Sequence, residues 1–249
     1  MKALITGATS GIGREMAKIL AARGVDLIIA SRDEKKMKSL AKRLPVPVRT
    51  IAVDLSKAAD CYALYEAVRE EEIDILINNA GFGAYGATWE VSLETELNML
   101  DLNVRAVQIL TKLFLADFRR RNSGYILNVA SSAGFLAGPL MSAYYATKGY
   151  VLRLSEAIHE ELRQAGSRVS VTALCPGHVE TNFDARANVR RSIGGLSAKR
   201  VAKAGIDGMF CGKVVVLPGA LMKLTYIGEK FLPETWMLKA AYRAQSKKG

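Results

Sequence analysis

Residues 2–13 read Lys-Ala-Leu-Ile-Thr-Gly-Ala-Thr-Ser-Gly-Ile-Gly, and this stretch decides the fold. Its first half is an apolar run typical of a buried strand, and its second half is rich in glycine. A helical pattern follows, with Met16, Ile19 and Leu20 on one face, and Gly24 ends it. A strand, a glycine turn and a helix N-terminus together favour phosphate binding, because the backbone can come close and N–H groups are unpaired. The spacing G-x-x-x-G-x-G differs from the usual dinucleotide fingerprint G-x-G-x-x-G.

Strand-like apolar runs alternate with helical patterns along the whole chain, which predicts βαβ units and a parallel sheet. Right-handed crossovers then place helices on both faces of the sheet. We therefore predict an α/β fold, a Rossmann-type doubly wound parallel sheet of about seven strands. One domain is expected over residues 1–249, with a helical tail over residues 219–249. The predicted strands are Ala3–Thr6, Leu27–Ser31, Val48–Val53, Ile75–Asn78, Tyr125–Ala130, Ser170–Leu174 and Val214–Leu217. The predicted helices include Glu34–Arg43, Ala58–Glu71, Asn103–Arg121 and Ser142–Gln164.

Polar or glycine-containing residues follow the first six predicted strands. They are Thr6-Gly7, Ser31-Arg32, Asp54-Leu55, Asn78-Asn79-Ala80-Gly81, Ser131-Ser132 and Pro176-Gly177. Parallel strands end at one edge of the sheet, and ligands bind beyond that edge. We therefore expect these residues to line one cleft, which favours a cofactor-dependent enzyme.

Tyr144 and Lys148 stand four residues apart in a predicted helix, so they lie on one face, one turn apart. A free phenol has a pKa of about 10 and exchanges protons poorly at neutral pH. A nearby ammonium stabilises the phenolate, so the spacing predicts a lowered pKa for Tyr144. Such a phenol can exchange a proton with a substrate oxygen. Taken alone, the pair is better explained as solvated residues on a helix surface.

Together, these motifs resemble the short-chain dehydrogenase/reductase family, in its compact single-domain branch, over residues 2–217. The matching motifs are Thr6–Gly13, Asn78–Gly81, Asn103, Ser131, Tyr144-x-x-x-Lys148 and Pro176–Thr181. The resemblance implies that Tyr144 exchanges the proton, that Lys148 lowers its pKa and binds the nicotinamide ribose, and that Ser131 bonds the reacting oxygen. Asn103 would hold a water that links Lys148 to solvent. The implied catalytic residues are thus Asn103, Ser131, Tyr144 and Lys148.

The resemblance also implies a nicotinamide dinucleotide along the strand ends. The implied contacts are Gly7, Ser10, Gly11, Ile12, Gly13, Asp54, Leu55, Asn79, Ala80, Gly81, Tyr144, Lys148, Pro176, Gly177, Val179 and Thr181. NAD sites usually carry a carboxylate where the second strand ends, but Ser31 and Arg32 stand here. Because arginine pairs with a 2′-phosphate, we predict NADP(H) as the preferred cofactor, read by Ser31 and Arg32, with NAD(H) as the alternative. Asp33 and Glu34 are interpreted as helix-start residues.

Substrate walls are expected from the segments after Gly81, Gly134 and Gly177. Their large side chains are Phe82, Tyr85, Trp89, Phe135, Leu136, Pro139, Leu140 and Phe183, and the pocket candidates are Phe82, Phe135, Leu140 and Phe183. Each could equally pack a loop on the core. Apolar walls suit a hydrophobic ketone, aldehyde or acyl substrate and its alcohol. Residues 182–199 fall where the family often has a mobile substrate lid. Its arginines, Arg186, Arg190 and Arg191, could meet an anionic group but are better explained as solvated.

The bulk composition limits other functions. The chain has 249 residues and a net charge of +11, but its basic residues lack aromatic interleaving, which disfavours nucleic-acid binding. Only His159 and His178 are present, so a multi-histidine metal site is excluded and no metal is expected. The cysteines Cys61, Cys175 and Cys211 are widely separated, which predicts reduced thiols. No run resembles a secretion signal, and a cytoplasmic location is expected.

Residues 220–245 form an amphipathic helical pattern with a break near Pro233. This pattern resembles the tails of a bacterial-type subgroup of the family. Packing within the chain or between subunits is favoured over contact with a membrane surface. By resemblance, a homodimer or homotetramer is expected through residues 103–121 and 142–164.

The predicted function is an NADPH-dependent oxidoreductase that interconverts a carbonyl and an alcohol on a small, apolar substrate. One alternative is a redox sensor that binds NADP(H) without turnover, since one fold hosts many functions. The other is a scaffold associated with a membrane surface or with nucleic acid.

Overall fold

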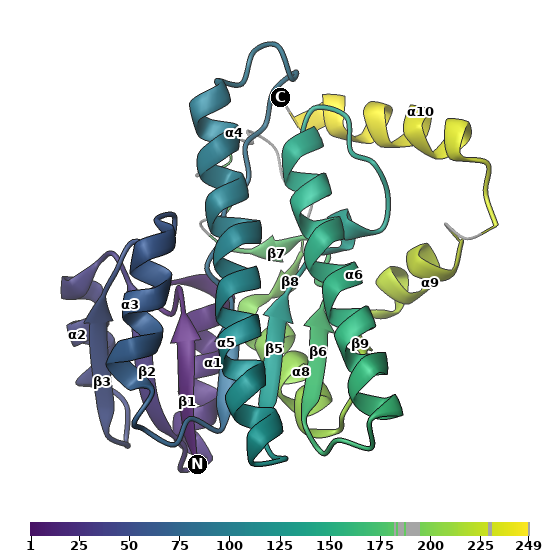
Figure 1. Ribbon diagram of the computed structural model, residues 1–249. Coiled ribbons are helices and arrows are strands. Elements are labelled where there is room, and N and C mark those ends of the chain that lie inside the picture. Colours follow the sequence, from purple (N-terminus) through teal and green to yellow (C-terminus); the bar gives the residue numbers. More distant parts are fainter. Residues whose placement is uncertain (182, 184–186, 188–194, 229–230, 249) are drawn as a thin grey trace.

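The structure is a computed structural model that describes residues 1–181, 183, 187, 195–228 and 231–248. Among these residues, seven strands form one sheet in the order β3-β2-β1-β4-β5-β6-β9, and all neighbours are parallel (Figure 1). The strands are β1 (Lys2–Thr6), β2 (Asp26–Ser31), β3 (Val48–Ala52), β4 (Ile75–Asn78), β5 (Tyr125–Val129), β6 (Ser170–Leu174) and β9 (Val215–Val216). The order reverses between β1 and β4, as in doubly wound sheets. The predicted Rossmann-type fold is therefore confirmed.

Helices cover both faces of this sheet (Figure 1). One face carries α1 (Gly11–Ala22), α2 (Glu34–Ala41) and α8 (Ala198–Phe210). The other carries α3 (Ala58–Val68), α5 (Ala106–Arg120) and α6 (Ser142–Gln164). Because both faces are buried, the strands read as unbroken apolar runs instead of alternating ones.

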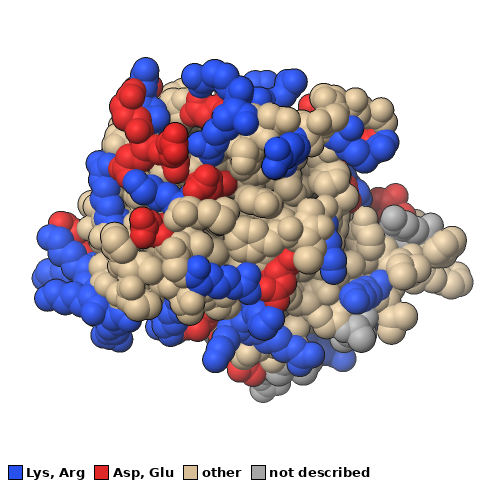
Figure 2. All heavy atoms as spheres, turned by 90° about the horizontal axis from the view of Figure 1, so that it is seen from below, with Lys and Arg blue, Asp and Glu red and all other residues tan. Residues whose placement is uncertain are grey.

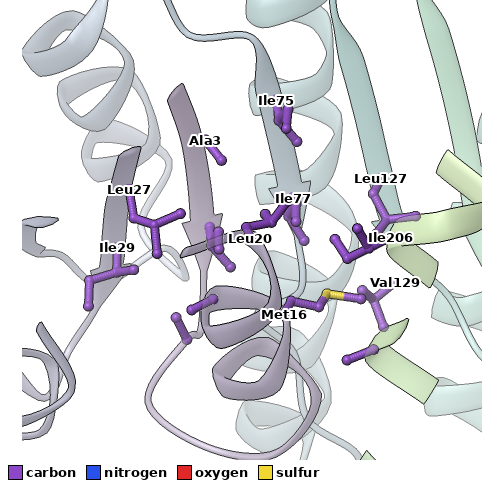
Figure 3. Packing of buried hydrophobic residues seen from close by; sticks show 14 of the residues in the cluster. Ala3, Met16, Leu20, Leu27, Ile29, Ile75, Ile77, Leu127, Val129 and Ile206 are labelled. Carbon is purple, nitrogen blue, oxygen red and sulfur yellow. The ribbon is translucent and has the colours of Figure 1, made fainter. Parts of the chain in front are cut away.

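Figure 3 shows the core on the first of these faces. Met16 and Leu20 of α1 and Ile206 of α8 pack over the strand side chains, and all three are fully buried. The strand side chains shown there are Ala3, Leu27, Ile29, Ile75, Ile77, Leu127 and Val129. Leu4 and Ile28, their neighbours along β1 and β2, belong to the cluster on the opposite face. The alternation of side chains along each strand thus supplies both cores at once.

The β7–β8 pair and helix α8 are absent from the predicted elements. Strands β7 (Val179–Glu180) and β8 (Leu196–Ser197) pair in parallel outside the main sheet. Two residues are too few to show a period. Helix α8 follows directly, and Gly205 and Gly208 interrupt its apolar pattern, although both glycines are buried. A Cβ on Gly205 would lie 2.8 Å from a methyl carbon of Leu174, so this helix packs closely on the sheet.

The predicted helix Asn103–Arg121 is part of a longer helical segment. Helix α4 (Leu93–Leu100) leads into a π-helical turn, Asp101–Arg105, and then into α5. Ser92 begins α4, since its hydroxyl accepts a hydrogen bond from the Thr95 N–H (3.3 Å). A π turn shifts the helical register locally, and such turns frequently occur at functional sites. Because of this shift, the apolar spacing along α4 is not continuous with that along α5. The helix predicted from the sequence therefore begins only at Asn103.

The two halves of the sheet are joined by Thr6 and Asn79. The Asn79 main-chain N–H donates to Thr6 Oγ1 (3.0 Å), and its side-chain Nδ2 donates to the carbonyls of Thr6 (2.9 Å) and Gly7 (3.1 Å). A Cβ on Gly13 would lie 2.7 Å from the Gly7 carbonyl oxygen and would also collide with the Asn79 amide. The absence of a side chain at position 13 therefore lets α1 approach the end of β1.

The tail forms α9 (Ala220–Gly228) and α10 (Glu234–Gln245), separated at Pro233 as predicted. The Tyr226 ring of α9 packs on Phe135, with ring centroids 4.9 Å apart. The large apolar residues of the tail that remain exposed are Leu224, Ile227, Phe231, Leu232, Trp236 and Tyr242. Packing within the chain, one of the two forms of packing favoured from the sequence, therefore involves only part of the tail. Over the described residues, no helix has the length and apolar character needed to cross a membrane.

The positive charge does not form one continuous patch on the face at the amino ends of the strands. Figure 2 views the molecule from that side. Its Lys and Arg side chains lie in several groups near the rim, interspersed with Asp, Glu and uncharged residues. This face therefore lacks the continuous basic groove that tracks a nucleic-acid backbone.

Candidate active site

A cleft of about 810 Å³ lies at the carboxyl ends of the strands. Residues after each of the strands β1 to β6 contribute to its wall, so the clustering expected from the strand ends is observed. The predicted site residues that line it are Gly7, Ser10, Gly11, Ile12, Ser31, Arg32, Asp54, Leu55, Asn79, Ala80, Gly81, Phe82, Ser131, Tyr144, Lys148, Pro176, Gly177, Val179, Thr181 and Phe183.

The glycine turn gives one part of this cleft a wall of backbone. Gly7 and Gly11 have φ values of +69° and +54°, in the left-handed region that favours glycine. A Cβ on Gly7 would lie 2.9 Å from Ala80 Cα, and one on Gly11 would lie 3.2 Å from Thr181 Cγ2. Ser10 begins α1 without a side-chain cap, and the first turn holds no acidic residue. The N-terminus of α1 thus opens on the cleft as a cradle for an anion.

Two cations line the end of the cleft beyond β2. They are Arg32 and Lys36, with Asp33 between them. Asp33 begins α2: its carboxylate accepts from the Lys36 N–H (2.9 Å) and pairs with Lys36 Nζ (2.9 Å). These contacts, led by the backbone hydrogen bond, lower the pKa of Asp33. As predicted, Asp33 is a helix-start residue, and its carboxylate is already bonded to Lys36 of the helix that it begins.

Ser131, Tyr144 and Lys148 meet at the other end of the cleft, and all three are buried. Ser131 follows β5, its hydroxyl accepts from the Ala133 N–H (3.1 Å), and it lies near enough to the Tyr144 phenol to lower its pKa. Lys148 Nζ donates to the Val129 carbonyl (2.8 Å) and lies 5.9 Å from the centroid of the Tyr144 ring. The strand end and one turn of α6 therefore bring two hydroxyls and an ammonium together.

Asn103 lies behind this group, in the π-helical turn, and does not line the cleft. Its amide bonds both main-chain groups of Phe82: Nδ2 donates to the carbonyl (2.8 Å), and Oδ1 accepts from the N–H (3.1 Å). Nδ2 also donates to Thr147 Oγ1 (3.1 Å), and that hydroxyl donates to the Tyr144 carbonyl (2.7 Å). Asn103 thus connects the segment after β4 to the turn of α6 that carries Tyr144.

Burial dominates the titration of Tyr144 and Lys148. It raises the pKa of Tyr144 to about 12; the Ser131 hydrogen bond opposes this rise, and Tyr145 adds to it. Burial also lowers the pKa of Lys148 to about 8, against a smaller opposing effect of Cys175. The lowering of the Tyr144 pKa predicted from the i, i+4 spacing is therefore wrong for the protein by itself, because desolvation of the phenolate is the largest effect and exceeds the lowering by Ser131.

Three further predicted residues lie outside the cleft. Gly13 supports the glycine turn from behind. Phe135 is buried in a separate cluster, because the 3-10 turn Ser132–Gly134 directs the chain away from the cleft. Leu140 lies in a loop at φ +65°, and the lining residue is its neighbour Met141.

The other side chains considered as substrate walls do not line the cleft either. They are Tyr85, Trp89, Leu136 and Pro139, and Trp89 is 88% exposed. Arg186, Arg190 and Arg191 lie outside the described residues.

The cleft also contains residues that the sequence analysis does not single out for the site. They include Thr9, Lys36, Asn98, Leu102, Met141, Tyr145, His178 and Gln245. Lys36 could have been found from its place one turn into the helix after Arg32. Gln245 belongs to no motif, and only the fold of the tail brings it to the cleft. In the part of the chain that the structure describes, no three His, Cys, Asp or Glu residues are grouped to hold a metal ion.

Comparison with known proteins identifies the family. The sequence profile described as short chain dehydrogenase matches residues 1–192. The chain belongs to the short chain dehydrogenase family. This dehydrogenase is 32% identical over 212 residues to an uncharacterized oxidoreductase of Staphylococcus saprophyticus, covering 82% of this chain and 88% of that one. It is 31% identical over 213 residues to the very-long-chain 3-oxoacyl-CoA reductase of Rattus norvegicus, covering 82% and 67%.

Solved structures of similar fold contain nicotinamide cofactors. A short-chain dehydrogenase from Sphingobium yanoikuyae in complex with NADPH has a TM-score of 0.85 and 30% identity, over 95% of this chain and 94% of that one. A short chain dehydrogenase/reductase from Burkholderia phymatum in complex with NAD has a TM-score of 0.83 and 29% identity, over 91% of each chain. The present dehydrogenase is accordingly an oxidoreductase that uses a nicotinamide cofactor.

The lowered pKa of Lys148 predicts how stability depends on pH. Between pH 8 and its ordinary value, the unfolded chain keeps a lysine proton that the folded chain has lost, so the free energy of unfolding rises with pH. Lys148→Met removes this titration. From pH 7 to pH 9.5, wild type should gain about 2 kcal/mol of stability relative to the variant. Urea unfolding of both proteins at the two pH values measures the gain, and a constant difference would contradict the pKa shift.

Proposed function

We propose that this dehydrogenase interconverts a carbonyl and an alcohol, with NADP(H) as its preferred cofactor. One observation carries the proposal. The hydroxyls of Ser131 and Tyr144, with the ammonium of Lys148, stand at one end of a cleft whose other parts are a glycine cradle and two cations. A proton donor and a site for a dinucleotide thus share one cavity.

The residues present fit a nicotinamide dinucleotide. Any side chain at Gly7 would fill the cradle, and the start of α1 offers N–H groups to a pyrophosphate. The residues proposed to hold the cofactor are Gly7, Ser10, Gly11, Ile12, Ser31, Arg32, Asp54, Leu55, Asn79, Ala80, Gly81, Tyr144, Lys148, Pro176, Gly177, Val179 and Thr181. The nicotinamide supplies or accepts the hydride, and the protein supplies position and the proton.

Tyr144 is proposed to donate the proton to the carbonyl oxygen during reduction. Its raised pKa keeps the phenol protonated at neutral pH, as a proton donor requires. Ser131, which lies beside the phenol, would hold the same substrate oxygen. Lys148 would stabilise the phenolate left behind, since its pKa of about 8 leaves the ammonium largely charged at pH 7. Asn103 is proposed to position Tyr144 through Thr147.

Tyr144→Phe should abolish turnover and leave cofactor binding nearly intact. The ring is held by packing: Phe183 lies 5.3 Å away between centroids, and Gly83 has no side chain to displace it. Loss of a general acid should lower kcat by about a hundredfold to ten-thousandfold. NADPH oxidation in the presence of ketones measures turnover, and NADPH fluorescence measures binding. Tyr62→Phe, an exposed tyrosine on α3, serves as the control. Unchanged turnover in Tyr144→Phe would refute the assigned role.

The preference for NADP(H) is argued from charge at the end of β2. A carboxylate there would repel a 2′-phosphate, but Asp33 is bound by Lys36 and caps α2. Glu34 is paired with Lys38 (2.7 Å). Because Lys36 is paired with Asp33, Arg32 supplies the positive charge that favours a 2′-phosphate.

Arg32→Ala should reduce the ratio of kcat/KM with NADPH to that with NADH. Removal of a charged hydrogen bond should change the ratio by about tenfold to a hundredfold. Lys42→Ala, at the C-terminal end of α2 and outside the cleft, should leave the ratio unchanged. Initial rates with both cofactors test this, and an unaltered ratio in Arg32→Ala would exclude it as the reader of the phosphate.

The substrate is proposed to be an apolar carbonyl compound, and a ketoacyl thioester is the preferred class. The apolar side chains near the reaction end are Phe82, Leu102, Met141 and Phe183. They suit an alkyl or acyl chain. The rat relative is a 3-oxoacyl-CoA reductase, which supports the ketoacyl group. The net charge of +11 favours encounter with phosphate-bearing ligands.

A homo-oligomer is proposed on the basis of an exposed apolar stripe. Leu93, Leu97 and Leu100 recur at helical spacing on α4 and are all exposed, although their helix packs against α6. The predicted contact surface on α5 and α6 lies next to them (Figure 1), and Tyr150 of α6 is also exposed. An unpaired apolar stripe of this kind marks a contact surface.

Leu97→Glu should convert the oligomer to smaller species, because a charge would be buried at the contact. Light scattering of the purified protein gives the mass of each form. The control is Leu224→Glu, which changes a more exposed leucine on α9 in the same way. A monomeric wild type would refute the proposal, and dissociation by Leu224→Glu alone would assign the contact to the tail.

A further inference from the structure

The tail exposes a set of large apolar side chains. Each is more than half exposed, and Phe231 and Trp236 reach 80% and 68%. The set, called the tail face below, consists of Leu224, Ile227, Phe231, Leu232, Trp236 and Tyr242. The two helices that carry most of it, α9 and α10, lie beyond α6 at one side of the molecule (Figure 1). Large apolar residues exposed together in one segment mark a contact surface.

Both helices are anchored on the body of the protein by their other sides. On α9, Met222 lies so close to the end of the sheet that a Cβ on Gly177 would be 2.6 Å from its Sδ. On α10, Gln245 is buried, and its main-chain carbonyl accepts a hydrogen bond from the Tyr85 hydroxyl (3.0 Å). The tail face is therefore the outward side of packed helices, and the packing within the chain leaves it uncovered.

The exposed side of α10 also carries cations. Trp236, Lys239 and Arg243 stand at i, i+3 and i+7, so they share one face of the helix, and all three are exposed. Within the described part of the chain, neither cation forms an ion pair, whereas Lys38 of α2 and Lys203 of α8 pair with acids of their own helices. Aromatic rings beside unpaired cations are typical of helices that lie on a membrane surface.

The charge of the tail distinguishes a lipid surface from a second copy of the chain. Residues 220–249 contain six Lys or Arg and two Glu, a net charge of +4, within a chain of net charge +11. Contact between two such tails, or between a tail and the body of another copy, would bring like charges together, which is costly. A surface of anionic phospholipids attracts the same cations.

The dimensions of the tail favour binding on a membrane surface over spanning it. Helix α9 has nine residues and α10 has twelve, whereas a spanning helix needs about 20. The side chains of the tail face protrude, and a fluid bilayer receives protruding side chains without matching their shape. Both helices would therefore lie in the plane of the interface.

We propose that the tail face binds the surface of membranes that contain anionic phospholipids. Phe231 and Trp236 enter the boundary between headgroups and acyl chains. Lys239 and Arg243 contact the lipid phosphates. Gln245, at the end of α10, lines the cleft, so docking keeps the candidate active site near the apolar phase in which hydrophobic carbonyl compounds dissolve. Membrane binding of this kind does not depend on the proposed reaction or cofactor preference.

Cosedimentation with lipid vesicles tests this binding. The protein should bind mixed vesicles, with equal parts of phosphatidylcholine and phosphatidylglycerol, about tenfold or more tightly than vesicles of phosphatidylcholine, because each cation near an anionic surface adds attraction. Raised salt should weaken binding to the mixed vesicles. Absence of binding to the mixed vesicles, or equal binding to both kinds, would overturn the proposal.

Tryptophan fluorescence locates the contact. The chain has two tryptophans, so Trp89→Phe leaves only Trp236. Its emission should move to shorter wavelength with mixed vesicles, because the indole leaves water. Trp236→Phe, which leaves Trp89, should show no shift. A shift in Trp236→Phe alone would place the contact elsewhere and overturn the role of the tail face.

Phe231→Glu should lower the affinity for mixed vesicles by about tenfold to a hundredfold, because it removes an inserted ring and adds a negative charge. Tyr62→Glu makes the matched change at an exposed aromatic residue of α3, on the opposite side of the molecule from the tail (Figure 1), and should bind as wild type. Equal midpoints of urea unfolding verify the fold of both variants. Equal vesicle binding by Phe231→Glu and wild type would contradict the proposal.

Light scattering without lipid separates the membrane from a second copy. Phe231→Glu should have the same mass as wild type. A smaller mass would assign the tail face to contact between copies and overturn the proposal. Turnover of carbonyl compounds is measured without vesicles, so failure of the proposed reaction and failure of membrane binding are distinguishable.

Discussion

The hydrogen bonds of Thr6 hold the structure together at the point where the strand order reverses. Thr6 Oγ1 accepts from the N–H groups of Asn79 and Ala80 (3.0 Å each), and the Asn79 amide donates to the Thr6 carbonyl. In a doubly wound sheet, the chain leaves neighbouring strands toward opposite faces here, and an opening results. The diverging strands would otherwise leave backbone groups unpaired, so Thr6 and Asn79 pair these groups where the cleft opens, and Asn79 also lines it.

Much of the fold could be predicted because burial on both faces gives the strands a simple signature. β4 (Ile75–Asn78), β6 (Ser170–Leu174) and α6 (Ser142–Gln164) coincide with their predicted ranges. Where the apolar side chains are exposed, or an element has two residues, that signal fails, which is why α4 and the β7–β8 pair escaped prediction. The position of the cleft then followed from the topology, because the carboxyl ends of parallel strands lie at one edge of the sheet.

Of the site residues, the strand topology predicts only those that follow a strand directly. Residues directly after a strand line the cleft, but those a few positions further depend on loop geometry. Phe135 is turned into another cluster, and Met141 takes the place expected for Leu140. Asn103 was found by resemblance, but its bonds to Phe82 follow from a π turn that no pattern reveals. Gln245 required the whole tail to be folded.

Burial sets the protonation of the Tyr144 phenol. It raises the pKa from 10.0 to about 12, which corresponds to about 3 kcal/mol, and the smaller lowering by Ser131 does not reverse this rise. Lys148 Nζ lies 5.9 Å from the ring centroid, and burial lowers the pKa of this lysine to about 8. Burial of the pair therefore leaves the phenol protonated and the ammonium largely charged at neutral pH. Both protonation states suit the proposed transfer of a proton from Tyr144 to a carbonyl oxygen, in which the ammonium would face the phenolate that forms.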